Sequence, residues 1–319
     1  GSQEAMVIAI TTLCNMETDA IFVENPTYVG LTHFAKISGY HVEPIETTFD
    51  GISLDALEER MLRVIEKGKK VKLLYVIPDY QNPLGASMSA DKRRKLLLLA
   101  KKYDFYILED NAYREFSYEN EHIGSLKSMD NDKRVIYIGS FSKILFPSLR
   151  VAVIVADQLL NVRNTQMLLS DLMAEVKGYT TVNTPSINQA ILGGIMLKHN
   201  YSLRSENINK VAGLKKKRDL FISNLNTYLD KKKYQWSQDI SWNEPKGGFF
   251  LTINVPFKVD EQEVIKCAKE YGVIFTPMSF FYFDKGGEYQ IRVAYSNISY
   301  DNIPIAVEKL AMYFKNKLN

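Results

Sequence analysis

The residues with the most evident chemical potential are Gly139-Ser140-Phe141-Ser142-Lys143, which follow the apolar stretch 135–138 and precede Arg150. A lysine amine becomes a nucleophile when burial and neighbouring positive charge lower its pKa. Hydroxyl groups beside an arginine suit a phosphate group. Taken alone, a Ser-x-Ser-Lys sequence after a strand is more often a helix N-cap followed by an exposed lysine. The other polar segments of the chain decide between these two interpretations.

Two further polar segments follow apolar runs. Asp110 comes after the run 105–108, and a carboxylate at the end of a buried strand can pair with a protonated heteroaromatic nitrogen. Asn82 lies in the turn-rich segment 78–85, and its amide can donate to a phenolate-type oxygen. The competing interpretations are a helix cap for Asp110, core packing for Tyr113 and a plain loop for 78–85.

These polar residues must be positioned by the elements around them. Helical and strand-like patterns alternate over the first two thirds of the chain, which is typical of an α/β fold with a mainly parallel sheet. Active sites in such folds form where the strands end. Helices are expected at 54–67 and at 90–103, the second capped by Ser89. The expected strands are 20–24, 41–45, 72–77, 105–109, 135–139 and 151–155.

The last third of the chain is interpreted as a smaller α+β domain. Basic helical stretches follow residue 185, and the Lys/Arg-rich run 215–218 is expected to be a solvated helix face. No repeat or low-complexity linker occurs, so the change of domain is expected within a long helix, giving a large domain over 1–200 and a small one over 201–319. Expected elements from Gly247 onward are strands at 249–255, 273–276 and 289–295 and helices at 261–271 and 302–317.

Composition and charge argue against several classes of protein. The chain of 319 residues is 46% hydrophobic and 24% charged, as in an ordinary globular protein. Its net charge of +3, from 40 basic and 37 acidic residues, does not indicate nucleic-acid binding. Cys14 and Cys267 have no metal-type spacing, and no apolar stretch is long enough to span a bilayer. We therefore expect a cytoplasmic protein without a metal site or a membrane or nucleic-acid partner.

The motifs together, in this order, resemble the fold-type I enzymes of the class I/II aminotransferase family, which depend on pyridoxal phosphate (PLP). The resemblance covers essentially the whole chain and is greatest to aminoadipate-type and kynurenine-type transaminases and to the aminotransferase-like domains of MocR/GabR-type regulators. It implies a mainly parallel seven-stranded sheet flanked by helices, with a smaller α+β C-terminal domain. The motifs that carry it are Gly-Ser-Gln-Glu-Ala (1–5), Glu-Asn-Pro-Thr-Tyr (24–28), Gln-Asn-Pro-Leu-Gly (81–85), Glu-Asp-Asn-Ala-Tyr (109–113), Ser-Phe-Ser-Lys (140–143), Arg150 and Ile-Arg-Val (291–293).

The resemblance implies that Lys143 would form a Schiff base with PLP and carry a proton from the substrate Cα. It also implies that four further residues would contact the cofactor ring. Asp110 would keep the pyridine nitrogen protonated. Asn82 and Tyr113 would hydrogen-bond the ring oxygen, and Tyr28 would stack on the ring. For Tyr28 alone, packing within a turn would be the simpler interpretation.

For the two anionic groups, the resemblance implies a phosphate site and a carboxylate site. Ser2 and Gln3 would present backbone amides at the start of a helix expected at 3–15, where the helix dipole favours an anion. Arg292 would bind the substrate α-carboxylate through a bidentate pair, with Asn82 beside it. For Arg292 alone, a surface salt bridge would be the simpler interpretation. The other expected phosphate ligands are Ser140, Ser142 and Arg150.

The expected activity is transfer of an amino group between an amino acid and a 2-oxo acid by a two-step, ping-pong route, in a homodimer with sites at its interface. The amino acid is left open between aromatic, aminoadipate-like and branched side chains, and lyase or racemase chemistry on the same scaffold also stays open. An apolar pocket lining is suggested by Phe280, Phe281 and Tyr282, although such clusters are usually core.

The resemblance also has departures. Leu84 stands where a small polar residue is commoner in the family. Family members carry a stretch ahead of the Gly-Ser-Gln loop that supplies part of the pocket, so we expect this chain to be truncated there, in preference to Gly1 and Ser2 being a cloning remnant. The main alternative function is an effector-sensing domain of a MocR/GabR-type regulator, which would have a DNA-binding domain upstream.

Overall fold

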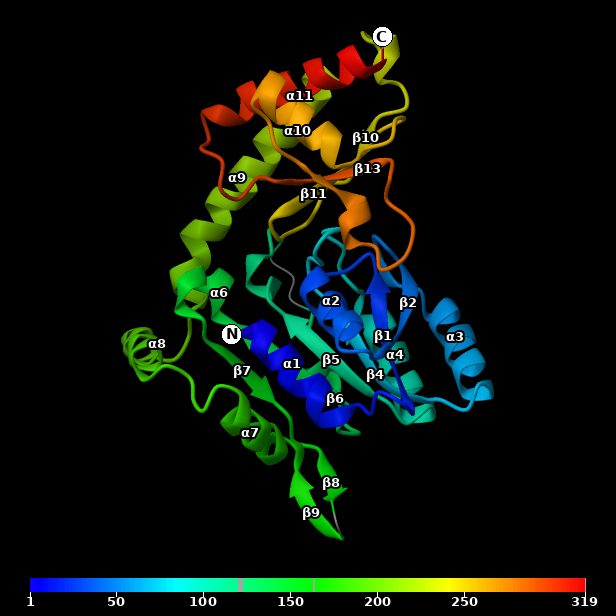
Figure 1. Ribbon diagram of the computed structural model, residues 1–319. Coiled ribbons are helices and arrows are strands. Elements are labelled where there is room, and N and C mark those ends of the chain that lie inside the picture. Colours follow the sequence, from blue (N-terminus) through cyan, green and yellow to red (C-terminus); the bar gives the residue numbers. More distant parts are fainter. Residues whose placement is uncertain (120–122, 163, 319) are drawn as a thin grey trace.

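The computed structural model describes residues 1–119, 123–162 and 164–318 (Figure 1). Its main element is a seven-stranded sheet of order β3-β2-β1-β4-β5-β6-β7. Strands β2, β1, β4, β5 and β6 pair in parallel, whereas β3 and β7 pair antiparallel with their neighbours at the two edges. The strands are β1 Asp19–Asn25, β2 His41–Thr48, β3 Gly51–Ile52, β4 Lys70–Val76, β5 Tyr106–Asn111, β6 Val135–Ser140 and β7 Ala152–Val155. The α/β class and the mainly parallel sheet are thus confirmed.

Both faces of this sheet are buried, which explains why its strands are continuously apolar. Successive side chains of a strand point to opposite faces. Ile21 and Val23 of β1 pack in the cluster that contains α1 (Ser2–Leu13), while Phe22 packs with α3 (Leu54–Glu66) and α4 (Ala90–Lys102). Figure 1 shows α1 lying across one face of the sheet. The expected cap of α4 is confirmed, because the Ser89 side chain accepts a hydrogen bond from the Lys92 amide.

A second sheet, of order β10-β11-β13-β12, forms the upper part of the molecule in Figure 1. Its strands are β10 Ser241–Trp242, β11 Phe250–Asn254, β12 Thr276–Pro277 and β13 Gln290–Ala294, and its helices are α10 Glu261–Tyr271 and α11 Asn302–Leu318. The strand expected at 273–276 is shorter than predicted. Gly272 ends α10 in a left-handed conformation, and the chain reaches the sheet only at Thr276.

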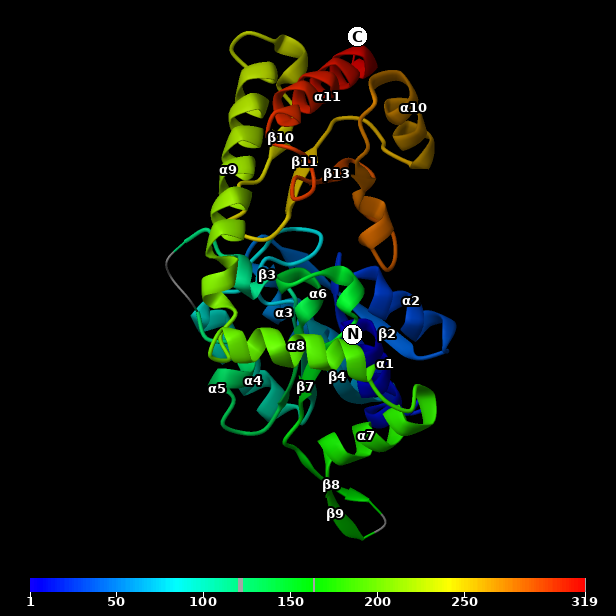
Figure 2. The ribbon, with the colours of Figure 1, turned by 90° about the vertical axis from the view of Figure 1, so that its left-hand side faces the viewer.

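The long helix α9, Arg204–Tyr228, runs from the level of the large sheet to the smaller one (Figures 1 and 2). We propose a domain boundary near residue 200, where this helix begins. The prediction that residues 215–218 form a solvated helix face is correct for only two of the four residues. Lys215 and Lys216 are exposed, but Lys217 donates to the Ser296 carbonyl (2.9 Å) and Arg218 to the Pro245 carbonyl (2.7 Å), so both join α9 to the small sheet.

The part of the chain between β7 and α9 forms an outlying region. It contains the hairpin of β8 (Leu159–Val162) and β9 (Thr165–Leu168), at the bottom of the view in Figure 1, and the helices α7 (Leu169–Thr180) and α8 (Ser186–Lys198). Figure 2 shows α8 on the outside of the molecule, and none of its residues is buried. In the described part of the chain, no helix is both long and apolar enough to cross a membrane.

Candidate active site

The polar residues expected to carry chemistry lie at the carboxyl ends of the parallel strands. Asp110 is near the end of β5, and Ser140 is the last residue of β6. The short helix α6, Phe141–Ile144, follows at once and contains Lys143. Because β5 and β6 pair in parallel, these residues meet at one edge of the sheet.

Lys143 is half-buried among positive charges. Burial lowers the pKa of its ammonium, and the charges of Arg292 and Arg150 lower that pKa further. No ion pair of the Lys143 ammonium occurs within residues 1–119, 123–162 and 164–318. Lys210 of α9 donates to the backbone carbonyls of Lys143 and Ile144 and so holds α6 in place. A half-buried amine with a lowered pKa is suited to nucleophilic attack and to proton transfer.

Asp110 is buried and uses only one of its two carboxylate oxygens. The Tyr75 hydroxyl donates to Oδ2 at 2.8 Å, while Oδ1 has no partner among the described residues. Burial raises the pKa of Asp110 to about 6, and the hydrogen bond from Tyr75 opposes that rise. A buried acceptor without a donor is costly, so this oxygen is suited to a ligand N–H. A protonated pyridine nitrogen is such a donor, and the site therefore fits PLP.

Besides Tyr75, two further tyrosines lie near this carboxylate. Tyr113 is buried edge-on between the rings of Phe249 and Phe250, at centroid distances of 5.5 and 5.6 Å. Burial and the charge of Asp110 raise the pKa of Tyr113 and also that of Tyr28. Both phenols are therefore neutral donors near pH 7. The structure brings both of these predicted residues to Asp110.

Arg292 lies on β13 of the small sheet and reaches the large domain. Its Nη1 donates to Asn82 Oδ1 at 2.7 Å and its Nη2 to Thr276 Oγ1 at 3.4 Å. The guanidinium lies over the rings of Phe250 and Phe281, at 4.3 and 4.5 Å. Burial lowers its pKa to about 10, and its Nε has no partner in the described chain. The surface salt bridge considered for Arg292 is therefore absent from the described residues, and a partly buried, unneutralised arginine favours a carboxylate ligand.

The expected phosphate ligands gather where α1 begins. Arg150 donates to Ser142 Oγ at 3.3 Å, and its carbonyl accepts from the Gly1 nitrogen at 3.0 Å. The first helical hydrogen bond of α1 is from Ala5 N to Gly1 O, so the amides of Ser2 and Gln3 have no acceptor within the helix. Ser140 is buried, and its hydroxyl oxygen accepts a hydrogen bond from the Ser142 amide.

The backbone of Arg150 is left-handed, with φ of 51°. Residues other than glycine rarely adopt this conformation, and such strain is concentrated at functional sites. The Gln3 side chain, in contrast, turns away from the anion site, because its Nε2 donates to the Gly30 carbonyl at 2.8 Å. Only the backbone of Gln3 is therefore available to an anion at this position.

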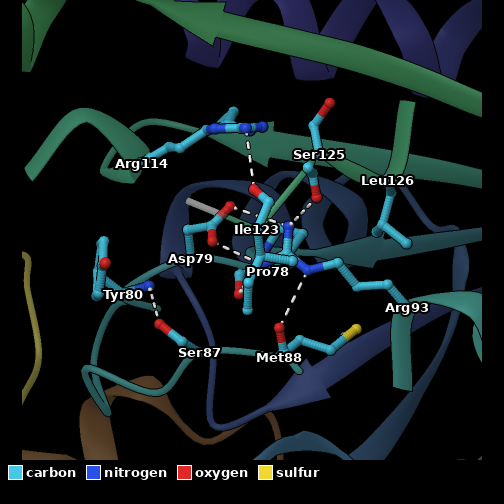
Figure 3. A network of polar contacts seen from close by, with 12 residues as sticks. Pro78, Asp79, Tyr80, Ser87, Met88, Arg93, Arg114, Ile123, Ser125 and Leu126 are labelled. Carbon is cyan, nitrogen blue, oxygen red and sulfur yellow. Dashed lines mark hydrogen bonds and ion pairs between the residues drawn. The ribbon is translucent and has the colours of Figure 1, made fainter. Parts of the chain in front are cut away.

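The loop that presents Asn82 is held by a buried arginine that the sequence analysis did not identify (Figure 3). Arg93 of α4 is fully buried and forms a two-point ion pair with Asp79, at 2.5 and 3.2 Å. It also donates to three carbonyls, those of Pro78 (3.2 Å), Met88 (3.0 Å) and Gly124 (3.0 Å). The run Asp-Lys-Arg-Arg-Lys (91–95) looks like a solvated helix face, so the sequence contained no signal for this role.

Gln81 and Glu24 complete the support of this loop. The Gln81 side chain donates to the Pro26 carbonyl (2.7 Å) and accepts from the Leu84 amide (3.0 Å). Glu24 accepts from the Ile77 amide at 2.9 Å, and burial raises the pKa of its carboxyl group to about 8. The turn at 78–85 is therefore a rigid segment and not a plain loop.

Apolar residues cover the loop on its other side. Leu84, where the family more often has a small polar residue, is buried against Met278 and Phe281. Of the aromatic run at 280–282, Phe281 is buried on Arg292, whereas Phe280 is 48% exposed. Gly248, which lies just before β11, has a φ of 75°. A Cβ at this position would lie 2.8 Å from the Tyr80 side chain, so the close approach of the two segments requires glycine.

Known proteins share the sequence and fold of this chain. The family pattern "Aminotransferase class I and II" matches residues 1–310. The (S)-3,5-dihydroxyphenylglycine transaminase of Amycolatopsis orientalis is 38% identical over 318 residues, which is 100% of this chain and 70% of the relative. Aromatic-amino-acid aminotransferase 1 of Thermococcus litoralis is 30% identical over 326 residues, covering 100% of this chain and 72% of that protein. The crystal structure of an archaeal alanine:glyoxylate aminotransferase matches with a TM-score of 0.87 and 31% identity, over 99% of this chain and 74% of that chain.

Transcriptional regulators also match, at lower identity. This chain is 25% identical to an HTH-type regulator of Bacillus subtilis and spans 56% of it. The two enzymes named above match at 38% and 30% identity and over all of this chain, and their family uses PLP. The expected family, fold, cofactor and enzyme activity are thereby confirmed. The chain belongs to the class I and II aminotransferase family and is a PLP-dependent aminotransferase.

Proposed function

We propose that Lys143 is the residue that binds PLP covalently and carries the proton during amino-group transfer. The observation that supports this most strongly is the half-buried ammonium of Lys143, whose pKa is lowered by burial and by Arg292 and Arg150. When bound, PLP supplies the electron sink that makes the Cα–H bond of the substrate acidic. Lys143 Nζ would take that proton from the Cα of the amino acid in one half-reaction, and in the reverse half-reaction it would deliver a proton to the Cα of the new amino acid.

The remaining residues bind and orient. Asp110 Oδ1 would accept a hydrogen bond from the protonated ring nitrogen of PLP, and Asn82 and Tyr113 would donate hydrogen bonds to its ring oxygen. Arg292 binds the α-carboxylate of the amino acid or 2-oxo acid, with its two nitrogens fixed by Asn82 and Thr276. The start of α1 together with Ser140, Ser142 and Arg150 would hold the phosphate, and Tyr28 would stack on the ring.

For the substrate, we propose an aromatic amino acid. Two relatives are named for aromatic substrates, and Arg292 lies between the rings of Phe250 and Phe281. Aromatic side chains pack favourably against such rings. The substrates of the family in general are an amino acid and a 2-oxo acid.

We also propose a homodimer. Members of this family are typically dimers, and α8 exposes apolar side chains along its whole length. Ile187 is 75% exposed, and Ile191 and Leu197 are exposed on the same helix. Several exposed large apolar side chains on one helix are suited to a protein interface. The cytoplasmic location stays a prediction.

The decisive experiment is an absorbance titration of the purified protein with PLP, comparing wild type with Lys143→Ala, followed by a panel of amino acids. We expect a long-wavelength band that requires Lys143 and that aromatic amino acids bleach. A Lys143-dependent band that no amino acid changes would favour the sensor function of a regulator. Absence of the band from wild type would refute the assignment of Lys143.

A further inference from the structure

We propose that Tyr75, a residue inside β4, is a positioning residue for Asp110: its hydroxyl ties down one carboxylate oxygen and thereby presents the other to the cofactor ring nitrogen. This inference rests on the proposed role of Asp110. It adds to the site a residue that none of the motifs contains.

The sheet geometry explains why these two side chains meet. Tyr75 of β4 lies opposite Leu108 of β5 in the parallel pairing. Side chains alternate between the faces of a strand, so Asp110, two residues beyond Leu108, points to the same face as Tyr75. Both residues are buried, and the Tyr75 hydroxyl donates to Asp110 Oδ2 at 2.8 Å. The contact therefore follows from strand register and not from a mobile loop.

The hydrogen bond makes the two oxygens of Asp110 unequal. Oδ2 is occupied by Tyr75, and Oδ1 has no partner in the described chain. A carboxylate held at one oxygen cannot rotate freely, so the direction of its free oxygen is set before a ligand arrives. Preorganisation of this kind reduces the entropy lost on binding.

The phenol also favours the charged form of the carboxylate. A hydrogen bond donated to a carboxylate lowers its pKa, which here opposes the increase due to burial. Tyr75 itself stays protonated, because burial and the charge of Asp110 raise its pKa well above the ordinary value. The other titratable groups that interact with Asp110 are Glu24 of β1, Tyr28 before α2 (Val29–Ile37) and Tyr113 after β5. No hydrogen bond from these three to Asp110 occurs in the described chain, so Tyr75 is the donor that distinguishes the two oxygens.

The test is Tyr75→Phe, which removes only the hydroxyl and preserves the ring that fills the core. We expect the dissociation constant of PLP, measured by absorbance or fluorescence titration, to rise about 10-fold, as for loss of a hydrogen bond to a charged group. The pH below which PLP affinity falls should also move upward, because Asp110 would then be protonated at a higher pH. Purely structural damage would lower affinity without this displacement of the pH profile.

Tyr313→Phe is a matched control. Tyr313 is also a buried tyrosine, and its hydroxyl donates to the Glu263 carboxylate at 2.6 Å, but this pair lies in the small domain. This variant loses the same kind of hydrogen bond. We expect its PLP affinity and its pH profile to equal those of wild type.

A second measurement separates the proposal from the assignment on which it rests. In an Asp110→Asn background, Tyr75→Phe should cause little further loss of PLP affinity, because both changes act through one pair. If Asp110→Asn weakens binding but Tyr75→Phe alone leaves affinity and pH profile unchanged, or if the two losses add, the role of Tyr75 is refuted. If Asp110→Asn has no effect, the proposed role of Asp110 fails instead.

Discussion

At the scale of single residues, the site is defined by charges that lack neutralising partners. The Arg292 guanidinium is partly buried between two aromatic rings, and its polar contacts are with the neutral groups of Asn82 and Thr276. A planar guanidinium held in this way matches both oxygens of a carboxylate, whereas the ammonium group of lysine does not.

We therefore predict that Arg292→Lys raises KM for the amino acid by roughly 10-fold or more, in line with the loss of a charge-assisted hydrogen bond. We expect a smaller effect on kcat, because the arginine contacts the α-carboxylate equally in the ground state and in the transition state. Steady-state kinetics with a good amino-acid donor would measure both values. An unchanged KM would show that the substrate carboxylate binds elsewhere.

Glu24 allows a prediction about pH. Burial raises the pKa of its carboxyl to about 8, above its value in an unfolded chain. The folded protein thus holds a proton that the unfolded chain releases, so the stability contributed by Glu24 is full at low pH and is lost as the pH rises through about 8. Buried Glu109, with a pKa of about 7, acts in the same direction.

Glu24→Gln should reduce the loss of stability of the protein between pH 6 and pH 9 by roughly 3 kcal/mol, because the loss runs over about two pH units, up to the folded pKa of about 8, at about 1.4 kcal/mol per unit. Urea unfolding at a series of pH values would measure the slope. The same slope in both proteins would mean that Glu24 is ionised in the folded state at pH 6.

At the scale of elements, the rigidity of the Asn82 loop comes from α4. Arg93 forms its five hydrogen bonds to Asp79 and to carbonyls at both ends of the loop and at Gly124, and the arrangement is visible in Figure 3. Removal of one partner from a buried ion pair leaves an uncompensated charge.

We predict that Arg93→Met lowers the free energy of unfolding by about 3–5 kcal/mol. The neighbouring Arg94 is exposed on the same helix, so Arg94→Met should change stability by no more than about 0.5 kcal/mol. Urea denaturation of the three proteins would compare them. Equal stability of the two variants would contradict the role assigned to Arg93.

At the scale of the whole molecule, the exposed apolar side chains of α8 predict self-association. Ile187→Glu should weaken the proposed dimer by about 10-fold or more, because a charge cannot be buried in an apolar interface without a partner. Sedimentation over a range of protein concentrations would detect this. Ile37→Glu is the control, because Ile37 is 83% exposed but the described helix α2 has no second exposed large apolar side chain, in contrast to α8; this change should not affect association. A monomeric wild type would contradict the homodimer.

The sequence alone determined much of this architecture, because the information is local. Hydrophobic runs of strand length, the capping Ser89 and the helix at 261–271 depend on neighbouring residues, and the structure confirms them. The ordered motifs were enough to indicate the family and the cofactor. The roles of the individual site residues stay predictions until the variants are measured.

Only the tertiary structure decided how those residues are supported. Tyr75 looks like one apolar residue among others in a strand, and Arg93 looks like part of a solvated basic helix face. Their roles depend on strand register, on burial and on which polar atoms are left without partners. These properties arise between segments far apart in the chain, such as β13 and the Asn82 loop, so no local pattern of residues encodes them.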